Sequence, residues 1–171
     1  MKKPSYKAFA AVAGIGGVML VFGANAANSS MENQDSSALH TLWSNYQQAV
    51  AKKDAKALLD LYVTADVPVM GGIAPESYAL ISAANKQAVP RTLLMTAKED
   101  VTGEIKLPPD QTENLDIHSD GEVGSISFDY KAKIGHGRII WTTVRTNDGW
   151  KIASVVYSIN VPAADRAEKP G

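Results

Sequence analysis

Hydrophobic residues recur at intervals of three and four positions at the start of the predicted folded unit. Ser36 or Ser37 is available as an N-cap, and the apolar residues between 38 and 52 are Leu39, Leu42, Trp43, Tyr46, Ala49 and Val50. This spacing predicts an amphipathic helix over 38–52. Asp54 can cap a second, shorter helix, whose shared side carries Leu58, Leu61 and Tyr62. We expect the two helices to form a hairpin.

The C-terminal half instead reads as short strands separated by turns. Glycine-containing triplets at 119–121, 135–137 and 147–149 are the turn signals. The four strands they predict span about 112–118, 122–134, 138–146 and 150–160. Two helices followed by a curved antiparallel meander predict an α+β fold class.

The middle of the chain gives weaker signals. Residues 67–73 predict a short apolar strand, interrupted at Gly71-Gly72, where we expect a bulge or a tight bend. The segment 78–84 fits a helix or a strand. Residues 96–105 predict a short helix that closes one end of the fold.

Strand periodicity also predicts the two faces of the sheet. We expect Tyr130 to lie opposite Trp141, Trp141 opposite Val155, and Thr146 opposite Trp150. The face that the helices should cover then carries Ile126, Phe128, Tyr130, Ala132, Trp141, Thr143, Ala153, Val155, Tyr157 and Ile159. The other face is mixed, with Ser125, Ser127, Asp129, Lys131, Arg138, Ile140, Thr142, Val144, Ile152, Ser154 and Val156. A mixed face of this kind meets water or forms a homodimer contact.

The first 26 residues have the pattern of a secretory signal peptide. Three lysines precede an apolar stretch over 8–24. Ala24 and Ala26 provide small residues at the two positions that signal peptidase recognises before its cleavage site. We predict cleavage after Ala26, a flexible leader over 27–37, a folded domain over 38–161 and a flexible tail over 162–171. The alternative is a retained membrane anchor, although the apolar stretch is at the short limit for a bilayer.

Composition narrows the class of protein. The chain has 171 residues, of which 45% are hydrophobic and 20% charged, as in one soluble globular domain. Cleavage would leave 14 basic and 18 acidic residues, so nucleic acid is not an expected partner. Cysteine is absent, which excludes disulfides and thiolate chemistry. We therefore predict a periplasmic protein with no membrane contact after cleavage.

Two segments of the chain resemble a known family. The helical run 46–62, followed by Asp66, and the closing run 144–158 are similar to the nuclear transport factor 2-like superfamily, including its SnoaL-like branch. The resemblance implies a cone-shaped, strongly bent sheet wrapped around the first helix, a pocket inside the cone and frequent dimers. It implies little about chemistry, because this fold hosts isomerases, dehydratases, cyclases and proteins that only bind.

The candidate acid–base residues are few. Asp129 lies in the middle of a predicted strand, but on the outer face beside Lys131 and Arg138, and His118 lies at a strand end. His136 at a hairpin tip and His40 in the first helix are expected to meet water, and Asp60 and Asp66 to serve helix ends and turns. The histidines show no metal-ligand spacing, and no cofactor is expected.

Aromatic residues are the stronger signal. We expect the interior to be lined by Trp43, Tyr46, Tyr62, Tyr130 and Trp141. Buried Tyr and Trp carry donors that a ligand could meet, although these rings could also simply fill the core. The first hypothesis is a non-catalytic domain that binds a small apolar or aromatic ligand or supports dimerisation. The alternatives are a cofactor-independent isomerase, dehydratase or cyclase with His118 or Asp129 as base, and a module that binds a protein partner.

Overall fold

The structure, a computed structural model, describes residues 24–133 and 135–161. Most of the predicted signal peptide and the whole predicted tail lie outside the described residues. Export and a periplasmic location therefore stay predictions. In the part of the chain that is described, no helix combines the length and apolar character that a membrane crossing requires.

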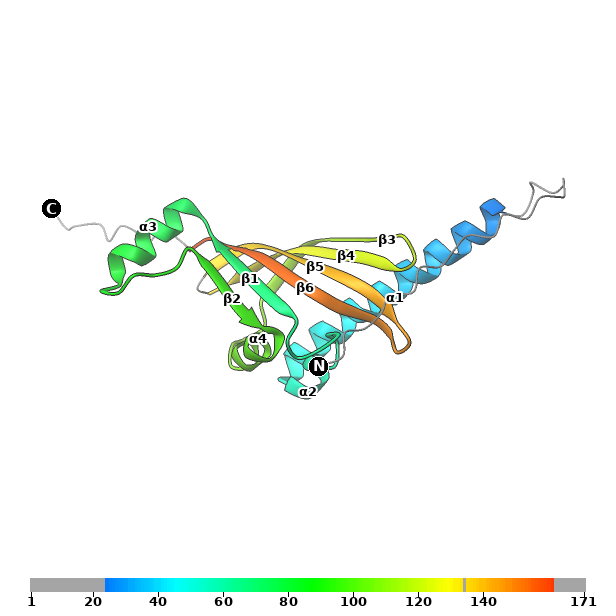
Figure 1. Cartoon of the computed structure of the whole chain (residues 1–171), viewed down its shortest axis with the longest axis horizontal. Helices are drawn as coiled ribbons and strands as arrows, with labels where there is room; N and C mark the ends of the chain where they lie inside the picture. Colours follow the sequence, from blue (N-terminus) through cyan, green and yellow to red (C-terminus); the bar gives the residue numbers. More distant parts are fainter. Residues whose placement is uncertain (1–23, 134, 162–171) are drawn as a thin grey trace, which may run out of the picture.

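Four helices and six strands make up the fold, in an α+β arrangement as predicted (Figure 1). In chain order they are α1 (Ala24–Lys52), α2 (Ala55–Leu59), β1 (Pro68–Ile73), α3 (Pro75–Ala84), β2 (Thr92–Thr96), α4 (Ala97–Glu104), β3 (Gln111–Ser119), β4 (Val123–Ala132), β5 (Gly135–Thr146) and β6 (Gly149–Ile159). The predicted helices after Asp54 and Thr96 are confirmed. Asp54 accepts a hydrogen bond from the Ala57 amide, and Thr96 and Glu99 form a reciprocal capping box.

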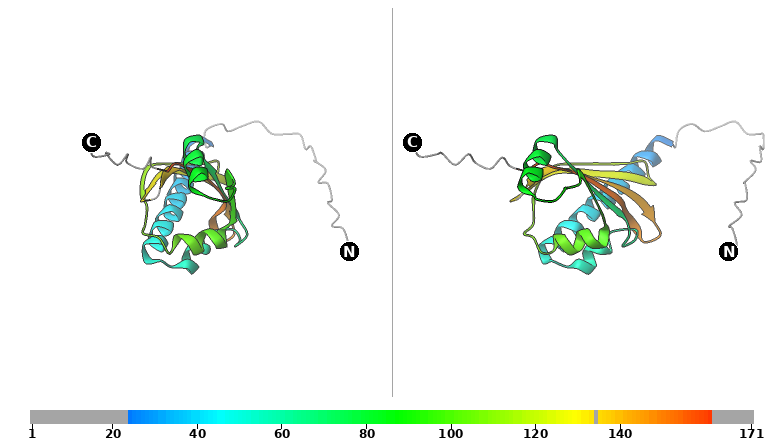
Figure 2. Two further views of the ribbon diagram at one scale, coloured as in Figure 1. Left: turned by 90° about the vertical axis from the view of Figure 1, so that its left-hand side faces the viewer. Right: turned by 60° about the vertical axis from the view of Figure 1, so that its left-hand side comes forward.

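The six strands form one sheet in the order β2-β1-β6-β5-β4-β3. Helices α1, α2 and α4 lie on the same side of it (Figures 1 and 2). The sequence predicted an antiparallel sheet. The sheet is instead mixed, because β1 pairs in parallel with β6. The closing strand β6 returns from the meander to lie beside β1, whereas β2 pairs with β1 on its other side. Strand β2 was not predicted from the sequence.

A cluster of four aromatic rings holds α1 against the concave face of the sheet. The Trp43 ring lies 4.3 Å from that of Phe128, and the Tyr46 ring lies 4.7 Å from that of Trp141, measured between centroids. Phe128 and Trp141 meet edge to face at 5.3 Å. Tilted and edge contacts of this kind are favourable beyond the apolar area that they bury. The predicted meeting of helix and sheet aromatics is therefore confirmed for these residues.

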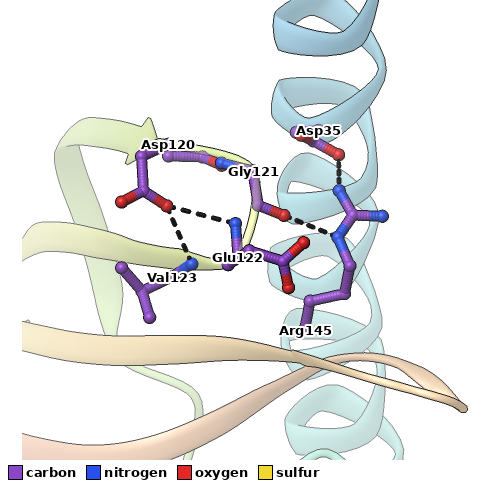
Figure 3. A network of polar contacts seen from close by, with 7 residues as sticks. Asp35, Asp120, Gly121, Glu122, Val123 and Arg145 are labelled. Atoms are coloured by element: carbon purple, nitrogen blue, oxygen red, sulfur yellow. Dashed lines mark hydrogen bonds and ion pairs between the residues drawn. The ribbon is translucent and has the colours of Figure 1, made fainter. Parts of the chain in front are cut away.

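The first helix begins earlier than predicted, so residues 27–37 are helical and not a flexible leader. Asp35 is only 7% exposed and forms an ion pair with Arg145 of β5. The Arg145 Nε atom also donates to the Gly121 carbonyl at 2.6 Å (Figure 3). The Arg145 guanidinium lies 5.1 Å from the centre of the Trp150 ring. This network ties α1 to the β3–β4 turn and to the β5–β6 hairpin. The sequence did not predict this part of α1, because Asp35 lies in a polar segment without hydrophobic periodicity.

The predicted register between β4 and β5 is shifted by four residues. Tyr130 lies opposite Gly137, and Trp141 lies opposite Ile126. Strand β5 begins at Gly135, earlier than expected, so residues 135–137 belong to this strand and not to a turn. Because the shift is even, Tyr130 and Trp141 keep the face that was predicted for them.

The register between β5 and β6 contains a bulge that the sequence did not reveal. Trp141 lies opposite Val155 as predicted, but Thr146 lies opposite Gly149 and not Trp150. The pairing shifts by one residue next to Thr142. As a result Ile152, which was assigned to the outer face, is fully buried.

The Gly71-Gly72 pair is neither a bulge nor a bend. Both glycines lie within β1 and pair without interruption to β2 and β6. A Cβ atom on Gly71 would lie 2.7 Å from Cζ of Tyr157, whereas one on Gly72 would have no neighbour nearer than 4.0 Å. Gly71 therefore leaves space for the Tyr157 ring to lie across β1.

Exposed apolar side chains form a row across the outer face of four adjacent strands. The row consists of residues that are paired across neighbouring strands, in order from β2 to β5: Leu94, Met70, Val156 and Ile140. All four are at least 40% exposed. The outer face therefore carries a continuous apolar row among its polar side chains. The homodimer contact expected on this face stays a prediction.

The Asp35–Arg145 pair generates a prediction about stability. Asp35→Ala should lower the free energy of unfolding by about 1–2 kcal/mol, since it leaves a partly buried guanidinium without its partner. Asp60→Ala is the matched control, because the Lys56–Asp60 pair is exposed and its loss should leave the free energy of unfolding nearly unchanged. Urea unfolding followed by circular dichroism measures both. Equal losses would contradict a specific role for Asp35.

Candidate functional site

A cavity of 430 Å³ lies between the helices and the concave face of the sheet. Its apolar wall comes mainly from the sheet and includes Val69, Met95, Ile139, Val155 and Ile159. A smaller recess of 110 Å³ shares Tyr46, Glu104, Asp110, Tyr130 and Ile139 with it. The main cavity is within the size range of small-molecule sites.

Four of the five predicted interior residues line this cavity. They are Tyr46 from α1, Tyr62 from the segment after α2, Tyr130 from β4 and Trp141 from β5. Trp43 is 7% exposed and packs on Phe128, but it does not line the cavity. Its role is therefore in the core, under the ring of Tyr46, with which it stacks.

The cavity also contains carboxylates that sequence reasoning missed. Glu99, Asp100 and Glu104 come from α4, and Asp110 comes from the segment before β3. Asp100 and Glu104 are four residues apart, which places both on one face of the helix. The neighbouring Ala97 and Val101 are buried and anchor α4 to the core. The sequence did contain a signal for these carboxylates, namely two acids spaced i, i+4 in the helix predicted over 96–105.

Burial perturbs the ionisation of these carboxylates. Desolvation, together with the charges of Asp110 and Asp100, raises the pKa of Glu104 to about 7, while hydrogen bonding from Tyr46 opposes the shift. Burial alone raises the pKa of Asp100 to about 6. Burial also raises the pKa of Asp110. A carboxyl group with a pKa near neutrality can either give or accept a proton at physiological pH.

Tyrosine hydroxyls complete the polar part of the wall. The Tyr130 hydroxyl donates to the Ser158 carbonyl at 3.0 Å, and burial raises its pKa to about 12. The pKa values of Tyr46 and Tyr62 are raised further, first by burial and then by nearby acids, Glu104 for Tyr46 and Asp100 for Tyr62. These phenols therefore stay protonated and can act as hydrogen-bond donors.

The two acid–base candidates from the sequence lie outside the cavity. Asp129 pairs with Arg138 at 2.9 Å and accepts from Asn114 at 2.7 Å, and first the Asn114 and then the Arg138 hydrogen bond lowers its pKa. His118 is exposed and lies 3.1 Å from Asp116. Neither residue lines the cavity, so neither can act there as the base.

The remaining candidates also have surface roles. Asp60 forms an exposed ion pair with Lys56 at 2.6 Å. His40, Asp66 and His136 are exposed. Among residues 24–133 and 135–161, no three His, Asp or Glu side chains are grouped closely enough to hold a metal ion.

The raised pKa of Glu104 predicts how stability depends on pH. Its pKa in the folded state is about 7, above the ordinary value of 4.5, so the folded protein holds the proton more tightly than the unfolded chain. The resulting penalty is absent below pH 4.5 and complete above pH 7, and stability falls as the pH rises between them. Glu104→Gln should therefore be more stable than the native protein at pH 8, by about 1–2 kcal/mol after allowance for solvent screening, but not at pH 4.5.

Urea unfolding at the two pH values measures this difference. Glu113→Gln is the control, because Glu113 is exposed on β3 and does not line the cavity. An equal effect of Glu104→Gln at both pH values would show that Glu104 is ordinarily solvated.

Comparison with known proteins identifies the fold. No protein-family model and no curated protein matches the chain. Solved structures do match. An NTF2-like protein of unknown function from Shewanella baltica has a TM-score of 0.56 at 11% identity, over 75% of this chain and 95% of that one.

Two further solved structures agree with this match. An NTF2-like protein with a cystatin-like fold from Novosphingobium aromaticivorans has a TM-score of 0.56 at 13% identity, over 85% of this chain and 95% of that one. A putative dehydratase of the NTF2-like family from Streptomyces avermitilis has a TM-score of 0.52 at 14% identity, over 75% of this chain and 98% of that one. At these identities the likeness concerns the fold alone, and the chain has the nuclear transport factor 2-like fold, in which α1 lies along the concave side of a six-stranded sheet.

Proposed function

We propose that this protein binds a small, partly apolar molecule inside its cone. The observation that carries the proposal is the 430 Å³ cavity, whose wall combines aliphatic side chains, aromatic rings and a few polar groups. Specific small-molecule sites have this composition, because apolar contact provides affinity and a few polar groups fix orientation. A core that only stabilised the fold would be expected to fill such a volume.

The sequence adds a location to this proposal. A signal peptide over 1–26 with cleavage after Ala26 would place the binding domain in the periplasm. Cleavage there would leave Asp35 and its contact with Arg145 in the mature chain. The resemblance to the SnoaL-like branch is compatible with a ligand in the cone and does not name one.

The proposal is tested by thermal unfolding of the mature protein with a panel of lipids, steroids, quinones and aromatic metabolites. A ligand at 100 times its Kd should stabilise the protein by about 2.7 kcal/mol. Gly71→Ala should weaken the effect, because its Cβ atom would displace the Tyr157 ring toward the cavity.

Gly72→Ala is the matched control for that experiment. It adds the same methyl group to the same strand, but the nearest atom is 4.0 Å away and belongs to the backbone. The two variants should therefore differ in ligand response. If no compound stabilises the protein, or if both variants respond as the native protein does, binding in the cone is contradicted.

A second candidate function is acid–base catalysis on the bound molecule. It is favoured by Glu104, whose pKa of about 7 and contact with the Tyr46 hydroxyl place a proton acceptor beside a donor. Enolisation or dehydration needs a base of this kind and a donor that stabilises the developing oxyanion. The reaction would use Glu104 or Asp100, and not His118 or Asp129.

Proton exchange distinguishes catalysis from binding. For a carbonyl compound that the panel identifies as a ligand, the native protein in D₂O should accelerate exchange of the proton next to the carbonyl group, as seen by NMR. Glu104→Gln should reduce that rate by about 100-fold or more while binding is retained. Equal exchange rates with the native protein and Glu104→Gln would exclude Glu104 as the base.

A further inference from the structure

The polar groups of the cavity have a one-sided charge. Its lining includes the acidic residues Asp100, Glu104 and Asp110, together with Glu99, whose carboxylate accepts hydrogen bonds from Thr96 in the helix cap. Among the described residues, no Lys, Arg or His side chain lines the cavity to balance them. The ion pairs in the described part of the chain involve other acids, so none of them neutralises this wall. A bound molecule is thus the available source of positive charge.

A tyrosine hydroxyl with no protein partner points independently to a ligand. The Tyr62 side chain is more than nine-tenths buried, at 6% exposed, and it lines the cavity. Within the described residues its hydroxyl forms no hydrogen bond, although Asp100 and Glu104 lie close enough to raise its pKa. The hydroxyl is therefore open to the cavity, where a polar group of a ligand can take the place of water as its partner.

The aromatic part of the wall suits the same kind of ligand. Tyr46 and Trp141 lie edge to face beside the cavity, and Tyr62, Tyr130 and Tyr157 line it as well. The faces of Tyr and Trp rings attract cations, and the attraction is stronger where water is excluded. The same rings provide apolar contact for the rest of a ligand.

We propose that the ligand of this cavity is an organic cation, an amine or quaternary ammonium group on an apolar or aromatic body. This inference rests on the proposed binding function and specifies the class of ligand. The charged group would lie beside Asp100 and Glu104. The N–H of an amine can donate there to the Tyr62 oxygen, whereas a quaternary ammonium group has no N–H and would contact the faces of the aromatic rings. The apolar body would lie against Val69, Ile139 and Val155 of the sheet.

The spacing of the acids favours an organic cation over a metal ion. The carboxyl groups do not form a group of three at metal-ligand distance within the described residues. Their charge is distributed along α4 and the segment that follows it, which matches an extended ligand with a diffuse charge.

The proposal has a consequence for pH. The groups that face Asp100 and Glu104 are carboxyls and phenols from several elements, namely Tyr46, Tyr62, Glu99, Asp110, Tyr130 and Tyr157. Burial holds Glu104 and Asp100 partly protonated near neutral pH. A cation favours their ionised forms, so binding should release protons and strengthen as the pH rises through 6 to 7.

Three probes of matched shape test the charge preference: 4-phenylbutylamine, 4-phenylbutanol and 4-phenylbutyrate. Calorimetric titration of the mature protein at pH 8 should show the amine binding about tenfold or more tightly than the alcohol, with the carboxylate weakest. At pH 5 the amine and the alcohol should bind within about threefold of each other, since Asp100 and Glu104, with pKa values of about 6 and about 7, are then mostly protonated.

Variants locate the preference in the cavity. Asp100→Asn combined with Glu104→Gln should remove the amine preference at pH 8, so that the amine and the alcohol bind this variant within about threefold of each other. Both changes replace a desolvated carboxyl with a neutral group of the same shape, and circular dichroism confirms folding. Asp116→Asn is the control, because it removes the same charge from exposed β3 outside the cavity and should leave amine binding within about twofold.

The outcomes separate this inference from the proposed function. Equal binding of amine and alcohol at pH 8, or tighter binding of the carboxylate, would overturn the cation proposal while leaving a ligand-binding cone. An equal loss in Asp116→Asn would also overturn it, because the preference would then come from general surface charge. Failure of all three probes to bind would contradict both proposals.

Discussion

The packing of one helix into a curved sheet determines most features of this protein. Trp43 and Tyr46 of α1 contact Phe128 and Trp141 of the sheet, so the helix is fixed along the concave face. Two of these four rings, Tyr46 and Trp141, also line the cavity, so the same packing forms part of its wall. Nearer the start of α1, the Asp35–Arg145 pair holds the helix to the β5–β6 hairpin (Figure 3).

The same packing explains the chemistry of the cavity. Helix α4 lies on the same side of the sheet as α1 (Figure 1). Its residues Asp100 and Glu104 line the cavity. Partial removal from water raises the pKa of both carboxyl groups, because a charge is less stable in an apolar environment. A polar wall with raised pKa values opposite an aliphatic wall is therefore a product of the fold.

Ligand binding and acid–base catalysis make different uses of the same groups. For a cation, Asp100 and Glu104 act in their ionised forms and Tyr62 accepts a hydrogen bond. For proton transfer, Glu104 would exchange a proton, and the hydroxyl of Tyr62, which has no hydrogen bond within the described residues, would donate to the substrate. An amine ligand would place positive charge beside α4, whereas a carbonyl substrate would develop negative charge there as it enolises, so the two proposals are tested separately.

The sequence by itself determined the helix after Asp54, the four-stranded meander, the α+β class and the aromatic residues of the interior, because local periodicity and turn chemistry encode them. Tertiary structure alone decided the parallel pairing of β1 with β6, the bulge that buries Ile152, and the role of Gly71 beneath Tyr157. It also decided that Asp100 and Glu104, and not Asp129 or His118, meet the tyrosines. Those features depend on contacts between segments far apart in the chain, and local spacing carries no information about which segments will meet.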